Sequence, residues 1–334
     1  MVGGKGGLAV TIVFYQKITD VWRRHIDAIE QEFPDAELVV EPTEVERRLP
    51  EAEVIVGGKL TEEVIRRAER LELIIVPFTG ISHLPLALIT ERGVRIANAH
   101  GNAPYVAERA VALILAFYGR VIEFHNDLRN GRWHGFWVNR GLDDTWDSVD
   151  GKRCVVLGAG EIGLHLARRL KPFGVEMVGF KRSKPPDVPP EYDEMVYSLD
   201  DALAGADIVV VALPQTAETR GILDERRLRA MPGALLVNVG RGEIIEEQAL
   251  ARCLSEGVLA GAAIDTWYNY PAEGVEGEPS RMAIHCRPNV VLSPHVGGFT
   301  EKAVRACTEE ACENLRRYLR GDALLHEADP TRAY

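Results

Sequence analysis

One stretch, residues 154–163, constrains the fold of this chain more than any other. It begins as a continuous apolar run, which is typical of a buried parallel strand, and apolar residues recur at helical spacing after it. Between the two lies a turn with three glycines in G-x-G-x-x-G spacing, Gly158, Gly160 and Gly163. Such a turn presents backbone N–H groups and the positive end of a helix to a pyrophosphate: Gly158 makes the turn, Gly160 gives the phosphates room, and Gly163 lets the helix pack closely on the strand. In this setting the spacing predicts dinucleotide binding rather than a purely structural turn.

Length and charge narrow the class of protein. A chain of 334 residues with 46% hydrophobic residues can bury a large core, and the usual domain size suggests two domains. The net charge of -11, with no basic run, argues against nucleic acid or an anionic membrane surface as a partner. We therefore expect a small-molecule partner.

The cysteines and the hydropathy pattern bear on the compartment. The five cysteines form no C-x-x-C pair and lie mostly within apolar patterns, which indicates reduced core thiols. No apolar run reaches membrane-spanning length, and residues 1–7 lack the form of a signal peptide. These features predict a cytoplasmic protein.

The first hundred residues predict a parallel α/β unit. Short apolar strands are expected at residues 8–15, 38–40, 54–56, 73–76 and 94–96, with helical patterns capped by Thr19 or Asp20 and by Thr61. This unit has no phosphate-type glycine loop. Its strand ends instead carry residues 77–80 and 98–102, in loops at the carboxyl edge where open α/β sheets bind ligands.

The remainder predicts a second α/β domain. Strands are expected at residues 154–157, 175–180, 208–213, 235–239, 260–264 and 290–293, with a helical pattern between each pair of neighbours. A helix entered at Pro104 would connect the domains, and a final helix at 300–320 would pack back on the first one. The segment 126–150, with three tryptophans and little periodicity, is either a surface excursion or a dimer contact.

Five motifs in this order resemble the D-isomer-specific 2-hydroxyacid dehydrogenase family, which includes glyoxylate/hydroxypyruvate reductases and phosphoglycerate dehydrogenases. They are Asn102-x-x-x-Val106-Ala107-Glu108, the 158–163 turn, Asn238-Val239-Gly240-Arg241-Gly242 with Glu247 and Leu250, Ala263-Ile264-Asp265, and Ser293-Pro294-His295-Val296-Gly297-Gly298. The resemblance implies a flavodoxin-like α/β substrate domain, residues 1–101 and 300–334, and a doubly wound Rossmann cofactor domain, residues 102–299. It also implies an active site in the cleft and, usually, a homodimer.

Two residues carry the chemistry that reduction of a 2-oxo acid needs. Arg241 follows a buried strand at the ligand edge, where its planar fork can hold a carboxylate bidentately. His295 follows another strand and Pro294, and we predict that it is the general acid and base. The alternative for Arg241 is a surface arginine that begins a helix.

Further substrate-side and nicotinamide-side residues come from the resemblance. It implies that the backbone at Thr79 and Gly80 binds the substrate carboxylate, that Asn102 matches a substrate-side asparagine of related formate dehydrogenases, and that Asp265 lies near the nicotinamide and the histidine. A plain turn at Thr79 and Gly80, and a helix cap at Asn102, are equally open readings.

The chain departs from the family at Tyr270, where the usual acidic partner of the histidine would stand. A carboxylate would raise the pKa of the histidine and orient its ring, whereas a phenol can only orient it, by one hydrogen bond. We therefore expect His295 to be less readily protonated, so that carbonyl reduction falls off at lower pH than in relatives with the acid. Because formate dehydrogenases also lack the acid, the substrate class stays open at this point.

The end of the second strand of the cofactor domain bears on cofactor choice. An NAD site places an acidic residue there, about 20 residues past the glycines, but this chain has Lys181-Arg182-Ser183-Lys184. Cations and a hydroxyl are suited to binding the 2′-phosphate of NADP(H). We therefore predict NADP(H) as the preferred cofactor, with NAD(H) as the alternative, and we expect no metal. The other predicted cofactor-binding residues are Glu161, Ile162, Leu213, Pro214, Thr219, Val239, Gly240, Gly297 and Gly298. For the loop at 213–219, ordinary turn chemistry is an alternative.

Three functions are compatible with these observations. The first is a dehydrogenase or reductase of a small 2-oxo or 2-hydroxy acid, D-specific by resemblance. The second is hydride transfer from formate or another small oxyanion, which Tyr270 and Asn102 favour. The third is a dinucleotide-sensing corepressor without catalysis.

Overall fold

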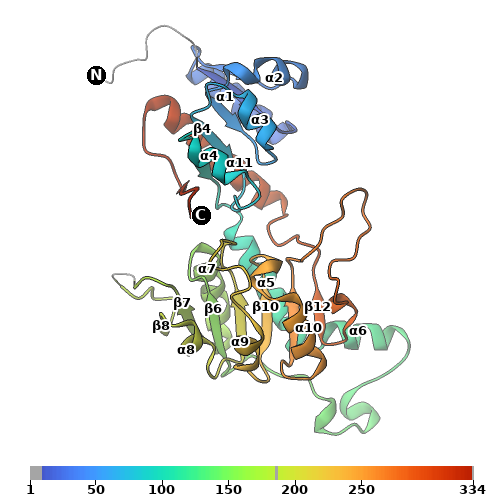
Figure 1. Ribbon diagram of the computed structural model, residues 1–334. Coiled ribbons are helices and arrows are strands. Elements are labelled where there is room, and N and C mark those ends of the chain that lie inside the picture. Colours follow the sequence, from blue (N-terminus) through green and yellow to red (C-terminus); the bar gives the residue numbers. More distant parts are fainter. Residues whose placement is uncertain (1–9, 185–186, 333–334) are drawn as a thin grey trace. The chain divides into compact units, whose positions relative to one another are not determined.

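The computed structural model describes residues 10–184 and 187–332, and these form two compact units (Figure 1). The first unit contains the chain up to Asn102 and again from Phe299, and the second runs from Ala103 to Gly298. The boundaries expected from the sequence differ from these by one residue at each crossing. Of the strand expected at 8–15, residues 8 and 9 lie outside the described residues.

The first unit is built around a six-stranded sheet in the order β13-β5-β4-β3-β1-β2. Strands β1 to β5 are parallel, in the 2-1-3-4-5 order of flavodoxin-like folds, and β13 adds to the edge antiparallel to β5. The elements are β1 (Thr11–Phe14), α1 (Asp20–Glu32), β2 (Glu37–Val39), α2 (Pro42–Arg48), the short 3₁₀ helix η1 (Leu49–Glu51), β3 (Val54–Val56), α3 (Glu62–Arg67), β4 (Leu73–Val76), α4 (Leu86–Glu91), β5 (Arg95–Asn98), α11 (Glu301–Arg320) and β13 (Glu327–Ala328).

Helices cover both faces of this sheet, which explains why its strands read as continuous apolar runs. Helices α1 and α11 pack on one face, where Ile26 and Leu315 are fully buried against strand residues such as Ile12. Helices α2, α3 and α4 supply the core of the other face. The helix predicted at 300–320 therefore packs on the first unit as expected, and the Thr300 hydroxyl caps it by accepting from the Ala303 N–H at 3.0 Å.

The second unit holds a seven-stranded, all-parallel sheet in the order β12-β11-β10-β9-β6-β7-β8. Counted from β6, this is the doubly wound 3-2-1-4-5-6 order with one further strand, so the predicted fold class is confirmed. The elements are α5 (Ala103–Tyr118), α6 (Val121–Arg129), η2 (Gly135–Val138), η3 (Leu142–Asp144), β6 (Arg153–Leu157), α7 (Glu161–Leu170), η4 (Lys171–Phe173), β7 (Glu176–Phe180), β8 (Glu194–Val196), α8 (Leu199–Leu203), β9 (Ile208–Val211), α9 (Glu225–Arg229), β10 (Leu235–Asn238), η5 (Gly242–Ile244), α10 (Glu247–Ser255), β11 (Gly261–Ile264), η6 (Ile284–Cys286) and β12 (Val290–Leu292).

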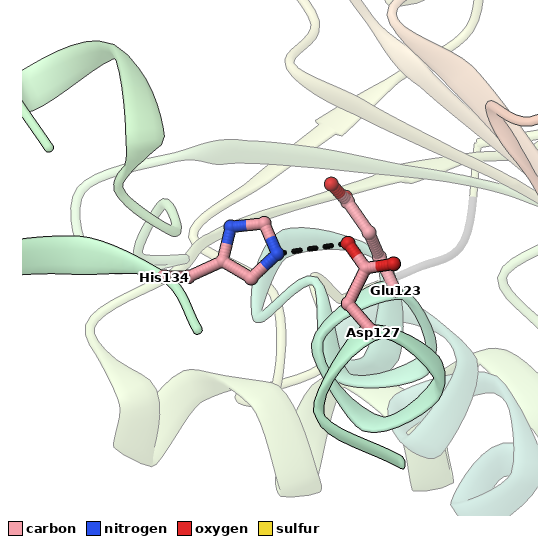
Figure 2. A group of neighbouring side chains, drawn as sticks. All are labelled: Glu123, Asp127 and His134. Atoms are coloured by element: carbon pink, nitrogen blue, oxygen red, sulfur yellow. Dashed lines mark hydrogen bonds and ion pairs between the residues drawn. The ribbon is translucent and has the colours of Figure 1, made fainter. Parts of the chain in front are cut away.

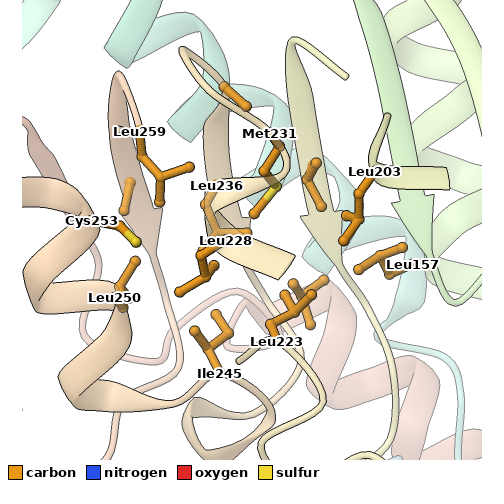
Figure 3. Packing of buried hydrophobic residues seen from close by; sticks show 14 of the residues in the cluster. Leu157, Leu203, Leu223, Leu228, Met231, Leu236, Ile245, Leu250, Cys253 and Leu259 are labelled. Atoms are coloured by element: carbon orange, nitrogen blue, oxygen red, sulfur yellow. The ribbon is translucent and has the colours of Figure 1, made fainter. Parts of the chain in front are cut away.

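This sheet is also covered on both faces. Helices α5 and α7 pack against each other and over one face, with Leu113 and Leu166 in a shared core. On the other face, α8, α9 and α10 bury a second core, in which Leu250 and Cys253 of α10 approach Leu236 of β10 (Figure 3). Both cores hold the strands in place, and predicted site residues follow the carboxyl ends of β6, β7, β9, β10, β11 and β12.

Three details of the second unit and of the chain's end differ from expectation. Strand β8 and the edge strand β13 were not predicted, because runs of three and two residues carry no periodicity. The helical pattern expected between residues 264 and 290 was wrong: that segment is irregular apart from η6. The carboxylate of Glu247 anchors it instead, by accepting from Ser280 Oγ at 2.8 Å and from the Arg281 N–H at 2.7 Å.

Residues 121–149 form an arm with little core of its own. Helix α6 contains no buried residue, and Phe136, Trp137 and Leu142 are 77%, 76% and 89% exposed. A charged cluster holds the arm. In it the ring of His134 lies between the carboxylates of Asp144 and Asp127, and Figure 2 shows Asp127 beside the ring with Glu123 nearby. The described helices include none that is both long enough and apolar enough to cross a bilayer.

Candidate active site

The glycine turn between β6 and α7 has the geometry that its sequence predicts. Gly158 has φ = 100°, and a Cβ there would lie 2.7 Å from the Ala212 carbonyl oxygen, so only glycine fits without strain. A Cβ at Gly163 would lie 2.9 Å from the Gly158 carbonyl oxygen and 3.0 Å from Val156 Cγ1 of β6, which reflects close packing of α7 on the sheet. Gly158 is thus required for the turn and Gly163 for the packing of the helix on the strand.

The start of α7 is suited to a diphosphate. Gly160 is the N-cap, and a Cβ there would meet no atom within 4 Å, so the turn opens into free space at this point. Glu161 and Ile162 form the first turn of the helix, where backbone N–H groups have no helical carbonyl to bond. The residues present therefore fit the pyrophosphate of a dinucleotide.

The basic segment 181–184 directly follows β7, as predicted, and acidic side chains are absent from it. Arg182 forms an ion pair with Glu218, which lies in the loop after β9. Both side chains are more than half exposed, so this pair contributes little to stability and can be displaced by a stronger anion.

In the loop at 213–219, Leu213 contacts a neighbouring turn and Thr219 makes hydrogen bonds within the loop. Leu213 lies against the turn after β10, since a Cβ at Gly240 would be 2.9 Å from the Leu213 carbonyl oxygen. The Thr219 hydroxyl closes the loop on itself: it donates to the Pro214 carbonyl at 2.7 Å and accepts from the Thr216 N–H at 2.8 Å. The hydroxyl of Thr219 is therefore engaged in turn chemistry.

Arg241 is presented by a turn that Asn238 holds from both sides. The Asn238 amide donates to the Arg241 carbonyl at 3.0 Å, and its Oδ1 accepts from the Gly240 N–H at 3.0 Å. A Cβ at Gly242 would overlap the carbonyl of Trp267, so the chain must be glycine where it passes this residue. The turn that carries the guanidinium is consequently fixed by its own sequence.

The guanidinium of Arg241 is half-buried, and among the described residues it bonds only to its own turn, with Nη1 donating to the Gly240 carbonyl at 2.7 Å. Burial lowers its pKa. Among the described residues no carboxylate lies within ion-pair distance of it. A partly desolvated cation without an acidic partner is a site for an anionic ligand.

His295 lies near this guanidinium in a strained backbone conformation, with φ = 57°. Burial and, next, the charge of Arg241 lower the pKa of its imidazole, while Asp265 acts in the opposite direction. The imidazole thus lies close to two charged groups, and the effect of Arg241 on its pKa is larger than that of Asp265.

Asp265 is buried behind the loop that carries His295. Its carboxylate accepts from the Val296 N–H at 3.0 Å, from the Gly297 N–H at 2.9 Å, and from the Ser293 hydroxyl. A Cβ at Gly297 would lie 2.8 Å from Asp265 Oδ2, so glycine permits this approach. Gly298 then ends the second unit.

Tyr270 lies beside His295, but the predicted hydrogen bond between them is not the contact that forms. The two rings are tilted at 46° with centroids 5.3 Å apart, and the phenol oxygen accepts from the Trp267 N–H at 3.1 Å. No hydrogen bond joins Tyr270 to the imidazole within the described part of the chain. In this structure the phenol oxygen is bonded to the backbone of Trp267, and the ring of Tyr270 flanks the imidazole.

Arg241, Asp265, Tyr270 and His295 therefore form one group in the second unit. The predicted substrate residues form another group, in the first unit. There the Thr79 hydroxyl donates to Asn102 Oδ1 at 2.7 Å, and Gly80 follows in the same loop after β4. This bond means that Asn102 restrains Thr79.

Sequence reasoning missed three residues that support the site: Asn238, Ser293 and Trp267. The first two are polar residues at the ends of buried strands within motifs already quoted, which was a usable signal. Trp267 had none, because its role depends on contacts with two loops.

Comparisons with known proteins found related sequences and structures. Residues 111–297 match the family model described as D-isomer specific 2-hydroxyacid dehydrogenase, NAD binding domain. The chain is 33% identical over 271 residues to a glyoxylate reductase of Thermofilum pendens, covering 80% of this chain and 78% of that protein. It is 30% identical over 319 residues to glyoxylate/hydroxypyruvate reductase B of Pectobacterium carotovorum, covering 93% and 95%. A crystal structure of a protein from Pyrococcus horikoshii OT3 superposes with a TM-score of 0.80 at 28% identity, covering 96% of each chain.

Proposed function

Because this chain belongs to the D-isomer-specific 2-hydroxyacid dehydrogenase family, we propose that it reduces small 2-oxo acids of the glyoxylate and hydroxypyruvate type to their D-2-hydroxy acids. The chain is thus an oxidoreductase that uses a nicotinamide dinucleotide. The observation that carries the choice of substrate class is Arg241, a half-buried guanidinium without an acidic partner among the described residues, beside the imidazole of His295.

The proposed chemistry assigns one task to each side chain. The reduced nicotinamide supplies the hydride when it is bound. Arg241 binds the substrate carboxylate and polarises the carbonyl, so that negative charge developing on the carbonyl oxygen is stabilised. His295, as the imidazolium, donates its proton to that oxygen and is left neutral, which gives the 2-hydroxy acid.

We assign substrate-binding roles also to Thr79, Gly80 and Asn102. The support is the family resemblance, together with the hydrogen bond by which Asn102 restrains Thr79. In this proposal Asn102 acts on the conformation of the loop, and the backbone of residues 79 and 80 offers N–H groups to the carboxylate.

For the cofactor we propose a preference for NADP(H), carried by Lys181, Arg182 and Ser183 after β7. The ion pair of Arg182 with Glu218 does not oppose this, because a 2′-phosphate carries more charge than one exposed carboxylate. Binding of both cofactors tests it. Arg182→Gln should weaken NADPH binding about tenfold or more with little effect on NADH, and equal or tighter binding of NADH to the wild type would contradict the preference.

A substrate panel tests the function as a whole. The purified protein is assayed against glyoxylate, hydroxypyruvate, pyruvate and larger 2-oxo acids, with NADPH and NADH side by side. We expect the smallest acids to give the highest kcat/KM. No turnover of any 2-oxo acid, with cofactor binding retained, would overturn the proposal and favour a dinucleotide-sensing role.

One observation favours a second function. Tyr270 stands where the family's acidic partner of the histidine is expected, and oxidation of formate needs no such acid. The same assay, run with formate and the oxidised cofactor in the absence of any oxo acid, decides this: turnover of formate alone would favour the second function.

We further propose that the protein is a homodimer in the cytoplasm. The support for the dimer is the arm 121–149, whose large apolar side chains are exposed in a single chain. The support for the compartment is that all five cysteines are free thiols, four of them buried.

A further inference from the structure

The strained conformation of His295 has to be imposed by its neighbours. A residue other than glycine at φ = 57° is held there only by contacts on both sides. The Asp265 carboxylate provides them on the C-terminal side, through the N–H groups of residues 296 and 297. On the N-terminal side the indole Nε1–H of Trp267 donates to the Ser293 carbonyl at 2.8 Å.

Trp267 makes a second contact to the same site. Its backbone N–H donates to the phenol oxygen of Tyr270 at 3.1 Å, and the ring of Tyr270 lies 5.3 Å from that of His295. One residue therefore fixes the loop that carries the imidazole and also the aromatic ring that flanks it.

A third contact reaches the arginine turn. The carbonyl of Trp267 lies where a side chain at position 242 would be, so it packs directly against the residue after Arg241. Trp267 itself is only 6% exposed and packs in the core with Ile264 and Ile284, which gives it a rigid base.

We propose that Trp267 is a positioning residue that fixes His295 and Tyr270 together and so sets the protonation of the imidazole. This inference rests on the proposed function, in which His295 is the acid. Loss of the indole N–H would release the Ser293 carbonyl and loosen the loop. Since burial is the largest cause that lowers the pKa of His295, a looser and better hydrated ring would have a higher pKa.

The test is Trp267→Phe, which keeps an aromatic ring in the core and removes the indole donor. We expect kcat for 2-oxo acid reduction to fall by on the order of tenfold, with the cofactor Kd unchanged. The alkaline limb of the pH–kcat profile should move to higher pH. A matched control is Tyr268→Phe, in the same core, because its buried hydroxyl has no hydrogen-bond partner in the part of the chain that the structure describes; it should behave as the wild type.

Two further variants distinguish failure of this inference from misfolding of Trp267→Phe and from failure of the proposed function. Tyr270→Phe removes the acceptor of the second contact from a half-exposed position, so it tests the inference even if Trp267→Phe fails to fold, and it should move the limb in the same direction. An unmoved limb in both variants, or an equal loss in Tyr268→Phe, would overturn the positioning role. If the wild type turns over no 2-oxo acid, the proposed function itself is wrong. If the wild type is active and His295→Asn is inactive while Trp267→Phe matches the wild type, only this inference falls.

Discussion

At the scale of single residues, we expect the protonation of His295 to differ from what the family resemblance implies. The acidic partner that the family resemblance implies would raise the pKa of the histidine, but Tyr270 is neutral, and burial and Arg241 lower that pKa. Proton donation needs the imidazolium, so it is complete below the pKa and is lost as the pH rises through it. A lowered pKa therefore moves the loss of reduction to lower pH.

Tyr270→Glu should reverse this shift. A carboxylate beside the ring stabilises the imidazolium, so the alkaline limb of the pH–kcat profile should move up by about one pH unit or more. Tyr270→Gln is the matched neutral variant: it also removes the phenol but adds no charge, so the limb of Tyr270→Glu should lie at higher pH than that of Tyr270→Gln. Identical profiles for wild type and Tyr270→Glu would show that His295 does not set this limb.

At the scale of elements, the arm 121–149 depends on ionic contacts where the rest of the second unit depends on a core. His134 Nδ1 lies 2.8 Å from Asp144 and Nε2 lies 2.8 Å from Asp127, and only the imidazolium can donate at both nitrogens. Hydrogen bonds to Asp144 and then Asp127 raise the pKa of His134, and the pKa of Asp144 is lowered to about 2. Arg120 faces Asp144 on the other side.

This cluster predicts a pH-dependent arm. Because the folded-state pKa of His134 is raised, its contribution is fully present below the ordinary histidine pKa of about 6.5 and is lost as the pH rises through the raised value. Limited proteolysis within the arm should therefore quicken as the pH rises. His134→Gln should be cut quickly at every pH, whereas His125→Gln, at an exposed position in α6 of the same arm, should follow the wild type. A pH-independent wild type would refute the prediction.

The elements also show which parts of the fold the sequence could predict. Apolar runs located all six strands predicted in the second domain, and three glycines located the turn before α7, because burial on both faces and steric demand act locally. The short strands β8 and β13, and the irregular segment that Glu247 anchors, could not be predicted, since they depend on pairing partners and hydrogen bonds distant in sequence. For the same reason Arg241 and His295 could be proposed from their strand ends, but the contacts of Trp267 could not.

At the scale of the whole molecule, the chain folds as two α/β units, one of them assembled from both ends of the sequence. In the proposed dimer the exposed apolar side chains of the arm would pack against a second copy. Replacing Phe136 and Trp137 together by serine should convert a dimer to a monomer in light scattering after size-exclusion chromatography. Val275→Ser, which removes an equally exposed apolar side chain elsewhere, should leave the mass unchanged. A wild type that is already monomeric would rule out the dimer.

The proposed active site depends most directly on the guanidinium of Arg241. The measurement that decides is kcat/KM for reduction of the preferred 2-oxo acid by Arg241→Gln, with the cofactor Kd determined alongside and with Arg229→Gln, a surface arginine paired to Glu225 and Glu256, as control. We predict a loss of at least about a hundredfold for Arg241→Gln, an unchanged cofactor Kd, and wild-type values for the control. A kcat/KM within about twofold of the wild type would show that the substrate carboxylate is bound elsewhere.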